Sequence, residues 1–128
     1  MTKRHKEWLA FAADDLGFSK IGLREEYFAK ACFHAHQAIE KTLKACLVYK
    51  GKDVPRIHHL IELLKLCGVS WLKEFEVELK IVDTFYIPTR YPEGIPGSLP
   101  DRLPGKKEAK EAIDLADRMY ALIQDKIS

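Results

Sequence analysis

The stretch from Glu25 to Gly51, EEYFAKACFHAHQAIEKTLKACLVYKG, decides the fold. Small and apolar residues recur in it at alternating steps of three and four: Phe28, Ala31, Ala35, Ala38, Thr42 and Ala45. This spacing predicts an α-helix, because residues three and four apart lie on the same helix face. Glu25 and Glu26 are expected in its first turn and Lys50 just before a Gly51 cap, where their charges complement the helix dipole.

Helical periodicity continues on both sides of this stretch. We expect further helices over residues 3–21 with a stop at Gly22, 57–67 with a stop at Gly68, 70–86 between an N-cap at Ser70 and a stop at Pro88, and 106–128. No segment shows sustained period-two alternation, so the predicted class is all-α. Long helices joined by short turns pack as antiparallel neighbours. The sequence therefore predicts a single domain, residues 1–128, built as an up-and-down bundle of four to five antiparallel helices.

One predicted connection is unlike the others. The segment 88–105 contains five of the six prolines of the chain, at Pro88, Pro92, Pro96, Pro100 and Pro104. Proline disfavours both a helix interior and a ladder strand, and a four-residue spacing does not match the three-residue repeat of a polyproline helix. A loop of this length in a compact domain is usually functional or disordered. We expect a stiff crossover loop laid over the bundle.

The composition of the chain limits the classes of protein to which it can belong. The chain has 128 residues, 47% hydrophobic and 31% charged, which suits a globular core without metal or disulfide staples. Its 21 basic and 19 acidic residues give a net charge of only +2, which argues against tight non-specific binding to duplex nucleic acid. Cys32, Cys46 and Cys67 form no CxxC pair and are expected as buried, reduced thiols. No apolar run approaches a membrane span, so we expect a soluble, cytoplasmic protein.

The polar side of the 25–51 helix carries a continuous stripe of potential ligand-binding residues. Its members are Lys30, His34, Gln37, Lys41 and Lys44. A solvated face is the interpretation that periodicity favours, whereas the residue types would also form a wall for an anionic ligand. His36 and Glu40 lie beside the stripe, one helical turn apart. His34 and His36 point to nearly opposite sides of the helix, so no metal site is predicted.

Three other places carry candidate chemistry. His58 and His59 begin a helix, where free amides and the positive dipole end favour anions, although capping or packing would also explain them. Arg90 and Tyr91 begin the proline segment, where arginine would fork onto a phosphate and tyrosine would stack. Asp15 lies near the apolar side of the first helix, where a carboxylate needs a partner. We expect Arg90 or His58 to supply that partner.

Four motifs, in this order, resemble the HEPN family, whose name stands for higher eukaryotes and prokaryotes nucleotide-binding. They are DDL at 14–16, CFHAHQAIEKTLKACL at 32–47, PRIHHL at 55–60 and RYP at 90–92. The resemblance implies a helical bundle, commonly a homodimer, that often acts with a minimal nucleotidyltransferase. Other branches of the family are RNases of toxin–antitoxin or defence systems. The matching positions here are Asp15, Gln37, Glu40, Lys41, Lys44, His58, Arg90 and Tyr91.

The chain departs from the RNase branches at one point. Those branches carry an arginine followed by a histidine after four to six residues, late in the domain. None of the six arginines of this chain has a histidine at that spacing, and no histidine follows His59. RNA cleavage by the usual route of the family is therefore not expected.

The leading hypothesis is a nucleotide- or substrate-binding module that acts with a nucleotidyltransferase partner. Its expected ligand-binding residues are Gln37, Lys41, Lys44, His58, Arg90 and Tyr91, supported by Asp15 and Glu40. No catalytic residue and no cofactor are assigned, because the chain has no glycine-rich phosphate loop and no paired acidic metal site. Two alternatives remain open. One is a ribonuclease toxin that uses His58 with Arg90, and the other is a non-catalytic dimerisation module.

Overall fold

The computed structural model describes residues 4–90 and 104–127, including the backbone but not the side chains of residues 85–90. Its elements are α1 (Arg4–Arg24), α2 (Phe28–Tyr49), α3 (Leu60–Cys67), the 3₁₀ helix η1 (Ser70–Phe75), α4 (Glu76–Arg90) and α5 (Lys106–Ile127). No strand occurs in these residues, and the predicted all-α class is confirmed. Within the same residues, no helix has both the length and the apolar character needed to cross a membrane.

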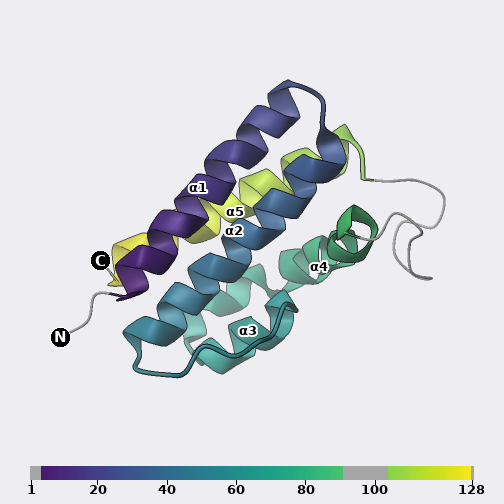
Figure 1. The fold of residues 1–128 in the computed structure, drawn as a ribbon. Coiled ribbons are helices and arrows are strands. Elements are labelled where there is room, and N and C mark those ends of the chain that lie inside the picture. Colours follow the sequence, from purple (N-terminus) through teal and green to yellow (C-terminus); the bar gives the residue numbers. More distant parts are fainter. Residues whose placement is uncertain (1–3, 91–103, 128) are drawn as a thin grey trace.

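Helix α2 lies at the centre of the bundle and contacts each of the other four α-helices. Figure 1 shows α1 and α2 side by side with opposite directions, α5 behind them, and α3 and α4 on the other side of α2. The predicted apolar face is buried from Ala31 to Ala45, including Ala35 and Ala38, and Phe28 at its start is half-buried. Small side chains on this face let neighbouring helices approach α2 closely.

The turn between α1 and α2 differs from the sequence prediction. Helix α1 does not stop at Gly22. This glycine is buried in the contact with α2, where a Cβ would lie 3.4 Å from Cβ of Ala31. The helix ends at Arg24, and α2 begins only at Phe28. Glu25 and Glu26 therefore lie in the connecting turn rather than in the first turn of α2. The glycine serves close packing here, not helix termination.

Helix boundaries in the second half are partly as predicted. Gly68 ends α3 with a left-handed φ of 63°, a conformation that glycine adopts without strain. Ser70 is not an N-cap, because Val69 occupies that position before η1. Helix α4 continues past Pro88 to Arg90, so the predicted stop at Pro88 is wrong. Most of the proline segment, residues 91–103, lies outside the described residues.

The chain between α2 and α3 does more than make a short turn. Helix α2 ends at Tyr49, yet His58 reaches Glu40 in the middle of that helix, with Nδ1 3.2 Å from Oε1. The segment 50–59 must therefore run back along α2 before α3 begins (Figure 1). Lys50 holds its start by donating from Nζ to the carbonyl oxygen of Cys67 (2.7 Å). This return path places His58 beside the polar side of α2.

Candidate functional site

The predicted polar stripe of α2 is solvated only in part. Lys30 is exposed, His34, Gln37 and Lys41 are half-buried, and Lys44 is buried. Glu40, beside the stripe, is buried as well. Helix α1 packs on one side of α2 while α3 and α4 pack on another, so little of the helix is left facing water. A solvated face therefore does not describe this stripe, and the charged groups in it need partners within the protein.

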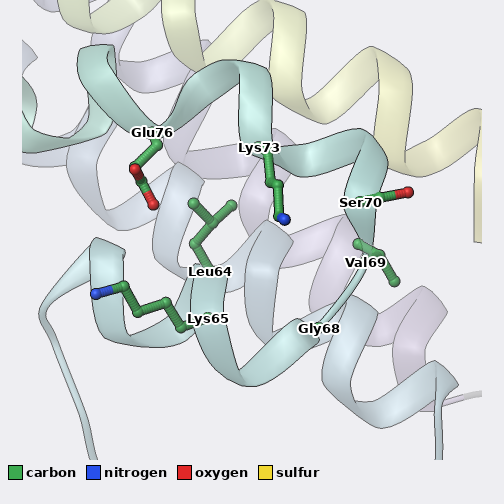
Figure 2. Close-up of a pocket in the computed structure, with 7 residues that line it drawn as sticks. All are labelled: Leu64, Lys65, Gly68, Val69, Ser70, Lys73 and Glu76. Atoms are coloured by element: carbon green, nitrogen blue, oxygen red, sulfur yellow. The ribbon is translucent and has the colours of Figure 1, made fainter.

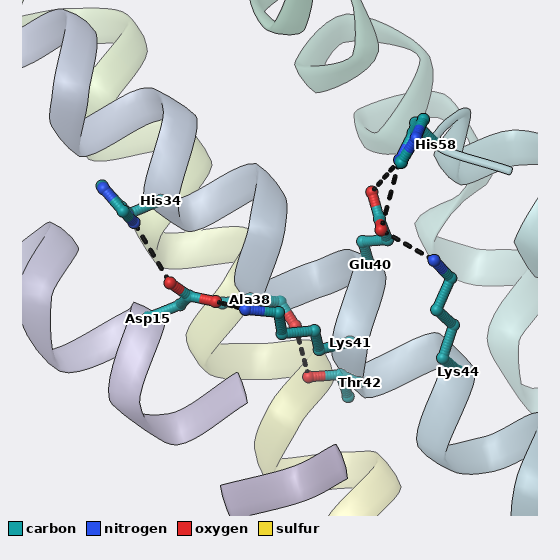
Figure 3. A network of polar contacts seen from close by, with 8 residues as sticks. All are labelled: Asp15, His34, Ala38, Glu40, Lys41, Thr42, Lys44 and His58. Atoms are coloured by element: carbon teal, nitrogen blue, oxygen red, sulfur yellow. Dashed lines mark hydrogen bonds and ion pairs between the residues drawn. The ribbon is translucent and has the colours of Figure 1, made fainter. Parts of the chain in front are cut away.

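The first set of partners, the Asp15 cluster, joins α1 to α2 (Figure 3). Lys41 donates from Nζ to Oδ2 of Asp15, and Nδ1 of His34 lies 3.1 Å from Oδ1. The Phe18 ring packs edge-on against the His34 ring, with centroids 4.6 Å apart. All three polar side chains keep some exposure: 14% for Asp15, 26% for His34 and 28% for Lys41.

The prediction that His58 is the partner of Asp15 was wrong. That imidazole contacts Glu40, and the carboxylate of Asp15 is taken by two residues of α2, the helix that faces it across the first hairpin. The side chain of Arg90, the other expected partner, lies outside the described residues.

The second set, the Glu40 cluster, joins α2 to the residues before α3 (Figure 3). Lys44 donates from Nζ to Oε2 of Glu40 (2.8 Å), and His58 Nδ1 lies 3.2 Å from Oε1. Glu40 and Lys44 are buried, with 6% and 7% of their side chains exposed, whereas His58 is 53% exposed. Because an ionised carboxylate only accepts hydrogen bonds, we assign Nδ1 of His58 as the donor to Glu40, which leaves Nε2 at the opposite edge of the ring.

The backbone amides of Leu60 and Ile61, at the start of α3, are not open to an outside anion, so one of the two interpretations left open for this helix start does not hold. The carboxylate of Asp83, on α4, accepts hydrogen bonds from the backbone N–H groups of Leu60 (3.0 Å) and Ile61 (3.3 Å). The free amides of this helix end are thus occupied by a carboxylate of the protein itself. Nε2 of the buried His36, on α2, lies 3.2 Å from Oδ1 of the same carboxylate.

Asp83 is not among the site residues predicted from the sequence. A signal was nevertheless present, since Asp83 follows Val82 directly and comes one helical turn after Leu79, and both of these residues are buried. A carboxylate at the edge of an apolar face needs a partner, as was expected for Asp15.

The structure thus separates the predicted site residues into groups. Glu40, Lys44 and His58 form one cluster, while Asp15 and Lys41 belong to the other. Gln37 lies half-buried on α2. Arg90 is the last residue of α4, and its side chain, like the whole of Tyr91, lies outside the described residues.

A hollow of about 310 Å³ lies at the other end of α3, between that helix and the start of α4 (Figure 2). Lys65, Lys73 and Glu76 supply its charged groups. None of the predicted ligand-binding residues whose side chains the structure describes lines it, so the hollow and the Glu40 cluster are separate features. Within the described part of the chain, no group of three or more His, Cys, Asp or Glu residues is placed to hold a metal ion.

The three buried cysteines have perturbed pKa values. Burial raises the pKa of the Cys32 thiol to about 12, with further contributions from the negative charges of Glu108 and Glu111. A hydrogen bond between Cys46 and Cys67 raises the pKa of Cys67 and lowers that of Cys46. All three cysteines are free and buried, as the sequence predicts.

Arg118 forms a surface tie between α5 and α4. Its Nη1 donates to Oε1 of Glu78 (3.0 Å), Nη2 pairs with the other oxygen of that carboxylate, and Nε donates to Asp114 (2.8 Å). The hydrogen bonds to Glu78, and then those to Asp114, raise the pKa of this guanidinium. Because the groups are exposed, this tie is a contact between helices and not part of a ligand site.

Comparison with known proteins gives one family. A family model described as HEPN domain matches residues 5–126. A protein of Methanocaldococcus jannaschii named "Putative toxin MJ1304" is 25% identical, over 96% of this chain and 88% of that protein. The crystal structure of TT1696 from Thermus thermophilus has a TM-score of 0.82 and 32% identity, covering 98% of this chain and 99% of that one. The crystal structure of ST0689, an archaeal HEPN homologue, has a TM-score of 0.77 and 25% identity over the whole of both chains. The chain belongs to the HEPN family.

Proposed function

We propose that the protein is a toxin-like HEPN protein that binds the phosphate groups of a nucleotide or an RNA beside His58. In this proposal it acts with a nucleotidyltransferase partner, as one half of a toxin–antitoxin pair. The similarity to a protein named as a toxin supports the class. The observation that carries the site is the pairing of a buried carboxylate, Glu40, with a half-exposed imidazole, His58.

The geometry of this pair suits ligand binding. Lys44 and Glu40 are both buried and their opposite charges balance each other. The carboxylate orients the imidazole through Nδ1, so the ring is ordered before a ligand arrives, and less entropy is lost on binding. A ring nitrogen on the side away from Glu40 is the group that we assign to a phosphate oxygen.

We assign the remaining contacts of the proposed site to Arg90, Tyr91 and residues of α2. Arg90 would fork onto the phosphate and Tyr91 would stack on the base, since α4 ends at Arg90 and packs on both α2 and α3. Gln37, half-buried on α2, would complete the wall, whereas Lys41 is paired with Asp15 in the other cluster. We assign the transfer chemistry to the nucleotidyltransferase partner, because this sequence contains no glycine-rich phosphate loop.

Calorimetry tests the binding proposal. Wild-type protein is titrated with ATP, with GTP and with a short single-stranded RNA, beside His58→Ala and Arg90→Ala variants. His59→Ala is the matched control, because it removes the neighbouring imidazole and leaves the Glu40–His58 pair intact. We expect binding that the first two variants lose and the control keeps. The absence of heat with every ligand, or unchanged binding by His58→Ala, would contradict the proposal.

The partner proposal needs its own measurement. The protein is co-expressed with a candidate minimal nucleotidyltransferase from the same organism, and the mixture is followed by size-exclusion chromatography with light scattering. We expect a single complex whose mass is the sum of its components. Two proteins that elute separately would contradict the partnership.

A ribonuclease is the second candidate, and the same Glu40–His58 pair favours it. An imidazole oriented by a carboxylate is a common general acid–base arrangement, and Arg90 would supply the cation for the phosphate. The missing arginine–histidine motif argues against it. Equimolar protein incubated with labelled RNA decides the matter: cleavage that His58→Ala abolishes and His59→Ala retains would establish a nuclease, and intact RNA would exclude one under those conditions. Intact RNA together with no ligand binding would favour a purely structural dimerisation module.

A further inference from the structure

Helix α3 begins without a side-chain cap of its own. His59 occupies the N-cap position, and its side chain makes no capping hydrogen bond. The cap comes instead from another helix, because both oxygens of Asp83 on α4 accept backbone N–H groups of the first turn of α3. A cap supplied from another helix does more than satisfy amides, since it also ties the start of α3 to a fixed place on α4.

Asp83 is held in turn by α2. His36 is buried, with 1% of its side chain exposed, and its Nε2 lies 3.2 Å from Oδ1 of Asp83, which is itself 17% exposed. A single carboxylate therefore contacts groups on α2 and α3 at once. His36 lies one helical turn before Glu40, so adjacent turns of α2 contact Asp83 and His58 respectively.

The position of His58 follows from these contacts. Leu60, whose amide is bound by Asp83, comes two residues after His58. Holding the amides of Leu60 and Ile61 limits where the preceding residues can lie, and that place is the one from which His58 reaches Glu40. The residues from His58 to Ile61 are thus attached to the bundle at two points, one through a side chain and one through the backbone.

We propose that Asp83 is a positioning residue for the Glu40–His58 pair. It holds the start of α3 against α2 and α4, so that Nδ1 of His58 donates to the buried carboxylate and the opposite edge of the ring faces the ligand. The consequence for ligand binding rests on the function proposed above, whereas the effect on the orientation of His58 does not.

Nitrogen NMR of the His58 ring tests this proposal directly. Wild-type protein is measured at mildly alkaline pH, where an ordinary histidine is neutral, and His58 is expected as the tautomer with its proton on Nδ1. Asp83→Ala removes the cap, and the isosteric Asp83→Asn keeps one acceptor oxygen but loses the second acceptor and the charge. Thr84→Ala, a change at the next residue of α4, is the matched control, because Thr84 is exposed and bonds only within its own helix in the described contacts.

We expect both Asp83 variants to shift His58 toward the tautomer mixture of free histidine, with the larger shift in Asp83→Ala and none in Thr84→Ala. A purely structural cap would lower the unfolding temperature and leave the tautomer unchanged, and that result in both Asp83 variants would overturn the proposal. If Asp83→Ala does not fold, Asp83→Asn decides the question alone.

Calorimetry with ATP and with the short single-stranded RNA gives the second readout. For a ligand that wild-type protein binds, Asp83→Ala is expected to weaken binding by roughly fivefold to tenfold, the equivalent of a lost helix cap. Wild-type affinity in both Asp83 variants would overturn the positioning role. Failure of the wild-type protein to bind either ligand would contradict the proposed function, while the NMR result would still decide how His58 is held.

Discussion

The Asp15 cluster and the Glu40 cluster are built from the same three kinds of side chain, yet the exposure of these side chains differs. Each consists of a carboxylate, a histidine and a lysine, and each includes residues of α2. In the Asp15 cluster, all three side chains keep between 14% and 28% of their exposure. In the Glu40 cluster, the carboxylate and the lysine are buried and only His58 reaches solvent.

This difference in exposure distinguishes the Asp15 cluster, which is a contact between helices, from the Glu40 cluster, which is the candidate site. Partly exposed ion pairs contribute little to stability, because water screens them and solvates each partner when the pair breaks. A buried pair behaves differently, because removing one partner leaves a charge that water cannot reach. The Glu40 cluster combines such a pair with a side chain directed outward, which is the combination expected where a protein must hold a reactive group still. The variants below test this contrast, from the largest expected effect to the smallest.

Glu40→Ala is expected to have the largest effect on stability. It leaves the ammonium of Lys44 buried without its counter-charge, which costs about 3–5 kcal/mol. Urea denaturation followed by circular dichroism measures the loss. The double variant Glu40→Ala, Lys44→Met is the control and should recover much of it, since no unpaired buried charge remains. A loss below about 1 kcal/mol in the single variant would place Glu40 with the solvent-screened pairs.

Ionisation of the Cys32 thiol lowers stability at alkaline pH and so limits the pH range in which the variants can be compared. The pKa of this thiol is raised from 9.0 to about 12 in the folded protein, so the unfolded chain loses the proton first as pH rises. Its contribution to stability is therefore fully present below pH 9 and is lost between pH 9 and about 12, at up to about 1.4 kcal/mol per pH unit. Denaturation midpoints measured from neutral to alkaline pH should fall more steeply in wild-type protein than in Cys32→Ala. Parallel curves for the two proteins would contradict this linkage.

Asp15→Ala is expected to reduce stability by about 1 kcal/mol, well below the effect of Glu40→Ala. Lys41 is 28% exposed, so its ammonium turns toward water when its partner is removed. The same urea experiment measures the loss, and added salt should reduce the difference from wild type. A loss as large as that of Glu40→Ala would mean that the two clusters are energetically alike.

Replacing His34 or His58 is expected to give the smallest changes in stability and the most specific difference between the two clusters. His34→Ala removes contacts with Asp15 and with the rings of Phe18 and Phe33, so a loss of about 1 kcal/mol is expected. His58→Ala should change stability by no more than about 0.5 kcal/mol, because the side chain is half-exposed. Thermal melts measure both. A destabilised His58→Ala beside a neutral His34→Ala would reverse the assignment of the two clusters.

Much of the fold could be predicted from local pattern alone. The burial of Ala31, Ala35 and Ala38 follows from their spacing on one helix, and the end of α3 at Gly68 follows from the ability of glycine to take a positive φ. The family, too, follows from short motifs in a given order. All of these are properties of residues close together in the chain.

Which side chain pairs with which carboxylate was decided only by the tertiary structure. The residue numbers of Asp15 and Lys41 differ by 26, those of Glu40 and His58 by 18, and those of His36 and Asp83 by 47. Which of several available charges meets a given carboxylate depends on the register and rotation of packed helices, which no single helical period contains. Gly22 shows the same limit, because a glycine that ends a helix and one that admits a neighbouring helix look alike until the neighbour is in place. By itself the sequence determined which faces are apolar and which residues need partners, and packing of the helices determined which partners they have.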